Sequence, residues 1–357
     1  MHDFFKHFTL TPLWLIAMSL ACSKTWGATR TWDGGGNGTN WRTSNNWSPN
    51  TRPAANDSLV FAGTTSVSNT NNFAADTAFA GISFSNGAGA FTLAGNRITL
   101  TGNVVNNDDS LQTLNLPMIL SGNRTFQTAS TGSLAVGGVL SGGGGLTKTG
   151  TATLTLSGNN SYTGATSVEA GLLYVNGNQS ASTGPLTIAA GAYLGGVGTI
   201  GGATTISGIH VPGSTSAAAG TQTFTGGLSY ASGSIFSWTL SADSTTTGYD
   251  KIIGSGALNV DSSAVFRVVL GTNVASQSSS FWDVNHTWSD VFTGFTGGAF
   301  SNSALRVIDT QGTALDTSSQ GSFSISGTTL SWSAVPEPSA TLAGLLLAAG
   351  LLRRRRA

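Results

Sequence analysis

The chain has 357 residues, of which 49 are glycine and 8% are charged. Outside its two ends it carries nine basic and thirteen acidic residues, which gives the central region a net charge of −4 and no basic cluster. Binding to nucleic acid requires clustered lysine and arginine that displace counterions from phosphates, so this composition excludes a nucleic-acid-binding protein.

The start of the chain has the features of a signal peptide. Lys6 precedes an apolar stretch over residues 13–21, and the small residues Gly27 and Ala28 follow it. A positive start, a short apolar core and small residues before the cut are the features that a signal peptidase recognises. We therefore predict a signal peptide over residues 1–28, with cleavage after Ala28 and export of the mature chain.

Cys22 is the only cysteine of the chain. It leaves an alternative open, because a lipoprotein signal ends at a cysteine that receives a lipid. Ser19 stands three positions before it, where such a signal usually has leucine. If Cys22 is instead removed with the signal peptide, the mature chain has no thiol, and a disulfide framework is excluded.

The region between residues 29 and 334 alternates short apolar runs with turn-forming residues. Apolar side chains alternate with threonine at 91–93, 98–100, 154–156 and 186–188. Such alternation places apolar side chains on one face of a strand and threonine on the other. Glycine, asparagine and serine between the runs form turns. No long stretch has helical periodicity, so the sequence predicts an all-β protein with many short strands.

The clearest repeat unit covers residues 143–177. Its successive strands are expected at 146–148, 153–156, 166–168 and 172–175, with glycines between them. Looser copies of this pattern extend from residue 91 to residue 206. Imperfect repetition of short strands is typical of a solenoid, in which each coil buries its apolar face against its neighbours. We therefore predict a right-handed parallel β-helix (β-solenoid) over residues 29–234, with coils ~4.8 Å apart. An array of β-sandwiches is the alternative.

The repeat unit resembles the passenger-associated transport repeat, also called the autotransporter-associated β-strand repeat. The resemblance is carried by GGLTKTG near the start of the unit, LTLSGNNSYTG in its middle and AGLLYVNG at its end. The run TWDGGG at residues 31–36 is similar to the start of proteins that carry this repeat. In autotransporters such repeats form an extended β-helical passenger, so the resemblance implies the same fold here.

Residues 235–334 differ in composition, because they concentrate aromatic side chains and most of the acids between the two ends of the chain. We predict a C-terminal β cap or end coils there, since the last coil of a solenoid would otherwise expose apolar edge strands. The alternative is a small separate β domain that binds sugars. In that case Trp282 and Trp288 are the candidate glycan contacts.

A β-helix can also carry a polysaccharide-degrading site, which needs paired carboxylates. The candidates are Asp108 with Asp109, and a cluster of Asp243, Asp250 or Asp261 with Arg267. Neighbouring residues of a strand point to opposite faces, which weakens Asp108 and Asp109 as a pair. We interpret these acids as turn or surface residues and expect no catalytic residues.

A metal site is not expected either. The predicted mature chain has two histidines, His210 and His286, which are far apart in the sequence, and it has no cysteine. The glycine-rich runs lack the regular aspartates of a calcium-binding β-roll. We therefore expect neither a metal nor another cofactor.

The last 23 residues form a distinct segment. Pro336, Glu337 and Pro338 precede an uncharged run over residues 339–352, and four arginines follow: Arg353, Arg354, Arg355 and Arg356. Under the positive-inside rule the arginines stay on the cytoplasmic side and hold the rest of the chain outside. We predict a transmembrane helix over residues 339–352. It covers only about 20 Å of a hydrocarbon core of about 30 Å, which favours a transient anchor.

Residues 335–357 resemble the PEP-CTERM sorting signal. The resemblance implies that Pro336, Glu337 and Pro338 are recognised by an exosortase, a membrane enzyme that cuts near this motif and passes the protein outward. The arginine cluster would stop transfer and orient the chain in the inner membrane. An ordinary C-terminal anchor is the alternative.

Together these features predict a non-enzymatic, exported β-solenoid protein with an inner-membrane intermediate and a final place at the cell surface or outside the cell. Exosortase substrates are associated with extracellular polysaccharide, so the resemblance implies a structural or adhesive role in an extracellular matrix or biofilm. A polysaccharide-binding or polysaccharide-degrading β-helix protein is the alternative.

Overall fold

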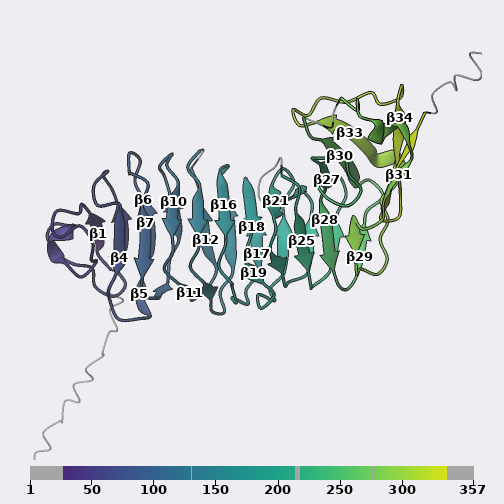
Figure 1. The fold of residues 1–357 in the computed structure, drawn as a ribbon. Helices are drawn as coiled ribbons and strands as arrows, with labels where there is room; N and C mark the ends of the chain where they lie inside the picture. The colour runs from purple at the N-terminus through teal and green to yellow at the C-terminus, as the bar shows by residue number, and fades with distance from the viewer. Residues whose placement is uncertain (1–26, 130, 214–217, 273, 275, 336–357) are drawn as a thin grey trace, which may run out of the picture.

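The protein is an elongated rod of stacked β-strands (Figure 1). The structure is a computed structural model that describes residues 27–129, 131–213, 218–272, 274 and 276–335. Each turn of the chain places one strand on each of two long parallel sheets and, on most turns, a third strand on a shorter sheet. The predicted all-β class and the parallel solenoid are confirmed, whereas the right-handed sense of the coil stays a prediction.

Sheet A follows one side of the rod and contains twelve strands of the described chain. Neighbouring strands within the sheet are parallel, except that β1 and β2 are antiparallel. Its strands, in spatial order, are β2 (Trp47–Ser48), β1 (Thr29–Trp32), β3 (Ser58–Phe61), β6 (Gly81–Phe84), β9 (Val104–Asn106), β12 (Arg124–Gln127), β15 (Leu146–Thr149), β17 (Thr166–Val168), β20 (Leu186–Ile188), β23 (Thr204–Ile206), β26 (Leu228–Tyr230) and β29 (Leu258–Val260).

Sheet B follows a second side and contains eleven parallel strands in the part of the chain that the structure describes. They are β4 (Ser68–Asn71), β7 (Thr92–Gly95), β10 (Gln112–Leu114), β13 (Leu134–Val136), β16 (Thr153–Leu156), β18 (Leu172–Val175), β21 (Tyr193–Gly196), β24 (Ile209–Pro212), β27 (Ile235–Leu240), β30 (Val265–Leu270) and β33 (Leu305–Asp309).

Two shorter sheets share the third side. Sheet C contains β5 (Thr77–Phe79), β8 (Ile98–Leu100), β11 (Met118–Leu120) and β14 (Leu140–Ser141). Sheet D contains β19 (Asn178–Gln179), β22 (Thr199–Ile200), β25 (Thr221–Phe224), β28 (Lys251–Gly254) and β32 (Phe292–Thr293). The four strands predicted within residues 143–177 correspond to β15, β16, β17 and β18, so the repeat unit is correctly divided by its glycines.

The core is a set of rows in which register-paired side chains stack from coil to coil. One row of sheet A contains Ile82, Val104, Phe126, Lys148, Val168 and Ile188. One row of sheet B contains Leu134, Leu154, Leu173, Leu194, His210 and Phe236. All of these side chains are buried. The alternation of apolar residues with threonine produces such rows because only one face of each strand points inward.

Three tryptophans close the N-terminal end of the rod. Trp32, Trp41 and Trp47 are fully buried, and the ring centroid of Trp47 lies 5.1 Å from that of Trp32 and 6.2 Å from that of Trp41. Buried Asn46, in the short 3-10 helix Ser44–Asn46, accepts the backbone N–H groups of Gly36 and Gly38 at 3.0 and 2.9 Å. The TWDGGG segment and the following asparagines therefore build a cap over the first coil.

The C-terminal end is larger and more irregular. Strands β27 and β30 have six residues each, and Figure 1 shows them rising above the line of the rod together with β33. Beside them lies an antiparallel sheet of β31 (His286–Trp288), β35 (Thr329–Ala334) and β34 (Gly321–Ser326). Two 3-10 helices, Ser280–Asp283 and Asn302–Ala304, connect these strands.

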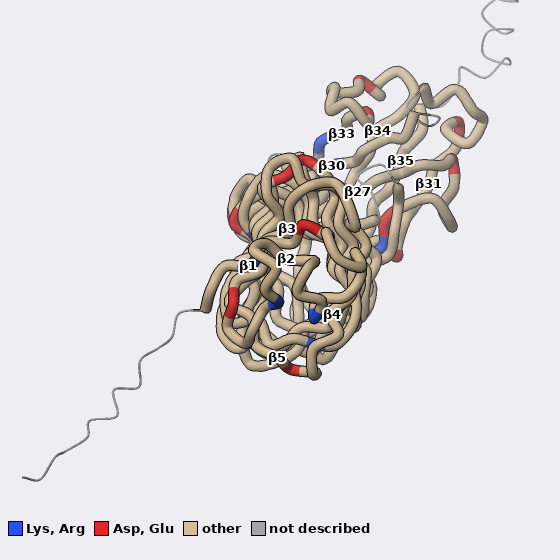
Figure 2. Tube along the Cα trace, turned by 90° about the vertical axis from the view of Figure 1, so that its left-hand side faces the viewer, with Lys and Arg blue, Asp and Glu red and all other residues tan. Residues whose placement is uncertain are grey.

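Charge is sparse on the whole rod. Figure 2 looks along it from the N-terminal end and shows isolated acidic and basic positions separated by long uncharged stretches. Among the residues that the structure describes, no helix is long and apolar enough to cross a membrane. The predicted transmembrane segment 339–352 lies outside the described residues.

Candidate functional site

Trp282 and Trp288 are core residues, which corrects their assignment as candidate glycan contacts. They are 1% and 0% exposed, so neither ring offers a face to a sugar. The ring centroid of Trp282 lies 4.9 Å from that of Trp332, and the Trp282 indole N–H donates to Asp243 Oδ1 at 3.0 Å. The indole N–H of Trp288 donates to the Ser244 carbonyl at 3.0 Å. Aromatic concentration in residues 235–334 therefore indicates packing between β-layers.

The predicted processing sites lie at or beyond the edges of the described chain. Ala28 is exposed, and its backbone N–H donates to Asp57 Oδ1 at 2.7 Å. The Asp57 carboxylate also accepts the Arg30 guanidinium at 3.1 Å, which holds the first strand to the second coil. Two other predicted features lie outside the described residues, so their roles stay predictions. They are the sorting motif of Pro336, Glu337 and Pro338 and the arginine cluster of Arg353, Arg354, Arg355 and Arg356.

The acids proposed as a cluster with Arg267 do not meet. Asp250 is fully buried; its two carboxylate oxygens accept the N–H groups of Gly220 at 2.7 Å and Thr239 at 2.8 Å. Burial raises the pKa of Asp250 to about 8. Asp261 instead accepts the N–H and hydroxyl of Ser263 within an exposed turn.

Asp108 and Asp109 also hold turns. Asp108 is buried and accepts the N–H groups of Ser110 at 2.7 Å and Gly87 at 2.8 Å, and Asp109 accepts the Thr131 hydroxyl at 2.5 Å. Burial raises the pKa of Asp108, but the bonds from Ser110, Gly87 and Ala88 outweigh it and leave the pKa below its ordinary value. These carboxylates bind backbone and hydroxyl groups, so they do not form an acid–base pair.

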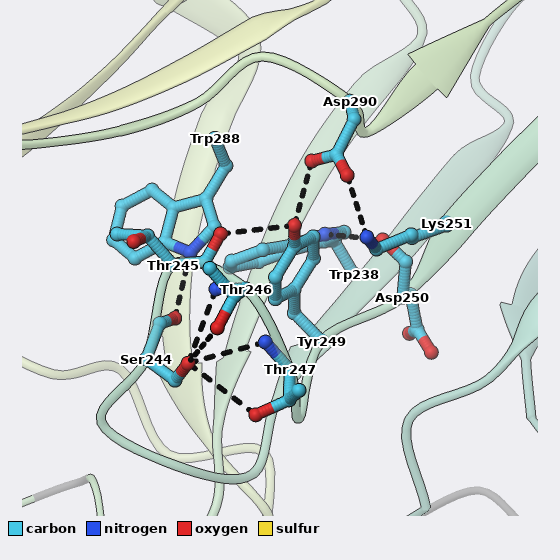
Figure 3. Close-up of polar contacts among 10 residues, drawn as sticks. All are labelled: Trp238, Ser244, Thr245, Thr246, Thr247, Tyr249, Asp250, Lys251, Trp288 and Asp290. Atoms are coloured by element: carbon cyan, nitrogen blue, oxygen red, sulfur yellow. Dashed lines mark hydrogen bonds and ion pairs between the residues drawn. The ribbon is translucent and has the colours of Figure 1, made fainter.

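A polar cluster joins β28 and the residues before it to the segment before β32 (Figure 3). Tyr249, Lys251 and Asp290 point toward one another there: Asp290 Oδ1 lies 2.6 Å from the Tyr249 hydroxyl, and Asp290 Oδ2 lies 2.5 Å from Lys251 Nζ. The ammonium also lies 4.7 Å from the centroid of the Tyr249 ring. Behind them, the ring of Trp238 packs against Tyr249 and Trp288 at 5.8 and 5.5 Å.

The protonation states of Tyr249, Lys251 and Asp290 favour a structural ion pair over a reactive centre. The hydrogen bond to Asp290 raises the pKa of Lys251. Burial tends to raise the pKa of Asp290, but the hydrogen bonds from Lys251 and Tyr249 outweigh it and lower the pKa. Burial and Asp290 raise the pKa of Tyr249. At neutral pH the lysine is a cation, the aspartate an anion and the tyrosine neutral, which stabilises an ion pair and leaves no free base.

Two buried ionisable residues lie inside the rod. Lys148 occupies an interior position of β15, and its ammonium donates to the carbonyls of Thr149, Gly150 and Ala170 at 2.8, 2.6 and 3.2 Å. It also contacts the Thr128 hydroxyl at 3.1 Å. Burial lowers the pKa of Lys148 to about 8, so the group remains mostly charged at pH 7. These bonds tie the ammonium into the wall between two coils.

His210 occupies an interior position of β24 in sheet B. Its Nδ1 lies 2.7 Å from the Tyr230 hydroxyl and its Nε2 lies 2.7 Å from Gln222 Oε1. Burial lowers the pKa of His210 to about 4 despite the bond to Gln222, so the imidazole is neutral. His286 lies elsewhere, stacked on Phe281 with 3.7 Å between ring centroids. Within the described residues no group of histidine, cysteine or carboxylate side chains can hold a metal ion.

A groove lies on the outer face of sheet B. It has a volume of about 310 Å³ and is lined by residues of β18, β21, β24, β27, β30 and β33 and by the turn after β33. The lining side chains of these strands lie on the face opposite the core rows. The six-residue strands β27 and β30 contribute Ser237, Arg267 and Val269 to the lining. Composition gave no signal for it, because its residues come from strands scattered over residues 172–312.

The groove combines two tyrosines with one arginine. Tyr174 and Tyr193 lie at its β18 and β21 end, and Tyr193 is 38% exposed. Arg267 lies on β30, partly buried, and its Nε and one terminal nitrogen donate to Ser237 Oγ at 3.2 and 3.1 Å. Burial lowers the pKa of Arg267, but a guanidinium remains charged at any physiological pH.

Comparison with known proteins identifies the repeat. Residues 146–175, from β15 to β18, match the model of the passenger-associated-transport-repeat family, which confirms the resemblance of this unit. The chain is 36% identical over 169 residues to the adhesin BmaC autotransporter of Brucella suis biovar 1 (strain 1330). That similarity covers 41% of this chain and 5% of the adhesin, so this chain spans a small part of that relative's length. No solved structure matches the chain.

Proposed function

We propose that this protein is a non-enzymatic, exported β-solenoid with a structural or adhesive role at the cell surface or in an extracellular matrix. The observation that carries the proposal is the rod itself. Its core is filled along its length by stacked side chains, and most of the acids in the described chain are bound within turns, in the core or in an ion pair. Such a body presents a long, weakly charged surface and suits mechanical contact better than catalysis.

The comparisons support this proposal from a second direction. The matched repeat family is named for passengers, and the similar protein of Brucella suis is an adhesin. A passenger-type solenoid with an adhesive role is therefore the function that agrees with both the architecture and the sequence similarity. A polysaccharide-degrading enzyme has less support, because Asp243, Asp250 and Asp261 are bound to separate partners and do not approach Arg267.

We further propose that the tail sorts the protein. In this scheme an exosortase recognises Pro336, Glu337 and Pro338 while the arginine cluster holds the chain in the inner membrane. Cleavage then releases the rod to the outside. The proposal is supported by the sequence of residues 335–357, whose resemblance to a PEP-CTERM signal rests on the motif, the apolar run and the arginines together.

The intact mass of the protein, measured in each cell fraction of its native host, tests this scheme. We expect a chain that begins at Thr29, ends near Pro336 and is found at the cell surface or in the medium. A chain in the inner membrane that still contains Arg353 to Arg356 would contradict the sorting proposal and make the tail an ordinary anchor. A mass equal to that of the bare polypeptide would also show that the serine and threonine hydroxyls carry no glycans.

A further inference from the structure

We propose that the groove on the outer face of sheet B binds an acidic polysaccharide, with the tyrosines stacking on sugar rings and Arg267 pairing with a uronic-acid carboxylate. This inference deepens the adhesive function proposed above and rests on it for the choice of a polysaccharide as ligand. It does not depend on how the protein is sorted.

The direction of the groove fits a chain-like ligand. Its lining comes from six successive strands of sheet B, so it runs across the strands and along the rod. Five steps between strands at ~4.8 Å give it a length of about 24 Å. The turn at residues 309–312 lies at the β33 end. A linear polymer can lie along such a groove, whereas a compact small molecule would fill only part of it.

The tyrosines offer an apolar face at the other end. Tyr174 pairs in register with Gly195, and a Cβ added to that glycine would lie 2.5 Å from the Tyr174 ring. The ring therefore lies over the glycine, on the floor of the groove. Tyr193, on the neighbouring row, is 38% exposed. Tyrosine combines an apolar ring with a polar hydroxyl, which suits the C–H faces and hydroxyl groups of a pyranose.

Arg267 determines the charge of the ligand. Within the described chain no carboxylate lies within ion-pair distance of its guanidinium, which donates to Ser237 Oγ. Asp309 also lines the groove, but its Oδ1 accepts the backbone N–H groups of Gln311 and Thr313 at 2.9 and 2.8 Å. A partly desolvated guanidinium without a protein anion is well suited to a planar carboxylate, which it can bind through two parallel hydrogen bonds.

Calorimetric titration of the mature protein with oligogalacturonate tests the inference. We expect saturable binding to this polyuronate and much weaker binding to a neutral malto-oligosaccharide of the same length. Arg267→Ala should weaken binding at least about tenfold, because a charged hydrogen bond is lost. Arg267→Lys should recover only part of that loss, since lysine keeps the charge but not the paired donors. Arg42→Ala, an exposed arginine far from the groove, is the matched control and should leave affinity unchanged.

A second variant guards against misfolding. Tyr193→Ala removes an exposed ring, so it should fold normally by circular dichroism and still weaken binding about tenfold if the ring stacks on the sugar. The inference is overturned if the folded protein does not bind oligogalacturonate, if the neutral oligosaccharide binds equally well, or if neither variant changes affinity. Binding to dextran sulfate alone would likewise overturn the assignment to a uronic acid.

The two proposals fail separately. A processed chain found outside the cell that does not bind oligogalacturonate would refute the groove and leave the sorting scheme intact. A chain that binds oligogalacturonate but keeps its arginines in the inner membrane would refute the sorting scheme and leave the groove intact. Binding should also release no new reducing ends, since no paired carboxylates line the described groove.

Discussion

Lys148 stands in a row of apolar side chains, between Phe126 and Val168 in the register of sheet A. A buried ammonium is unfavourable unless its hydrogens are bound, and here backbone carbonyls of two coils bind them. The lysine satisfies the Gly150 carbonyl in the turn after β15 and the Ala170 carbonyl after β17, and it shares the Thr149 carbonyl with the Thr128 N–H. Lys148 is therefore an interior residue whose ammonium links two coils through their backbone carbonyls.

Replacing this lysine tests that link. Lys148→Met keeps the volume but leaves carbonyls unpaired in the core, so we expect the free energy of unfolding in urea to fall by about 3 kcal/mol. Arg52→Met, at an exposed position, is the control and should change it by less than about 0.5 kcal/mol. Equal stability of Lys148→Met and the unchanged protein would show that water serves those carbonyls.

His210 should make the free energy of unfolding depend on pH. Its pKa is about 4 in the folded protein and about 6.5 in an unfolded chain, so between these values only the unfolded chain takes up the proton. The contribution of His210 to the free energy of unfolding should therefore fall as pH falls from 6.5 to 4, by up to about 3 kcal/mol, whereas the raised pKa of Asp250 acts in the opposite sense. His210→Gln cannot titrate, and the difference between the two stability curves should shrink over this range. Parallel curves would contradict the assignment.

At the scale of elements, coils approach so closely that some positions exclude any side chain. A Cβ on Gly164 would lie 2.3 Å from the Gly145 nitrogen in the previous coil, whereas a Cβ on Gly143 would meet nothing within 4 Å. Both glycines flank strands of the same repeat, and the sequence does not distinguish them. The spacing of coils makes the difference.

This pair gives a matched test of coil packing. Gly164→Ala should destabilise the protein by about 3 kcal/mol, because backbone must move to admit the methyl group. Gly143→Ala should change stability by less than about 0.5 kcal/mol. Thermal unfolding of the two variants measures both effects, and a similar loss in each would mean that glycine flexibility matters more than the contact.

The sequence predicted the elements of the repeat better than the sites. Alternation of apolar residues with threonine located β15 to β18, because each strand is defined by its own residues. The same local pattern cannot show that Lys148 points inward, that Trp282 and Trp288 are covered, or that Tyr193 and Arg267 share a groove. Those facts depend on register between coils, which residues about twenty or more positions apart decide together.

At the scale of the molecule, aromatic side chains gather in the core at the two ends of the rod, while the core between them is mostly aliphatic. Trp41 packs on Phe61 and Phe79 at the N-terminal end. Trp282 and Trp332 pack at the C-terminal end. A parallel sheet that ended without such cover would expose strand edges, and solenoids need capping for solubility.

Removing the antiparallel strands β34 and β35 at the C-terminal end should make the protein form oligomers. A chain that ends at Gln320 lacks β34 and β35, so it uncovers Trp282 and loses the buried side chains of Phe323 and Trp332. We expect a red shift of tryptophan fluorescence and oligomers in light scattering. A chain that ends at Val335 is the control and should stay unassociated. A monomeric, unshifted chain ending at Gln320 would show that the antiparallel sheet is dispensable.

We expect the rod to begin forming at its N-terminal tryptophan cap. From β3 to β29, partner strands of sheet A lie only 18 to 30 residues apart. Each new coil can therefore pair with the coil before it, and the entropy lost is that of closing one short loop. The predicted signal peptide leads this end out first, and growth then follows translocation. Amides of β3 should gain protection before those of β29 in pulsed hydrogen exchange. Assembly from one end would let a rod of any length fold at the pace at which it emerges.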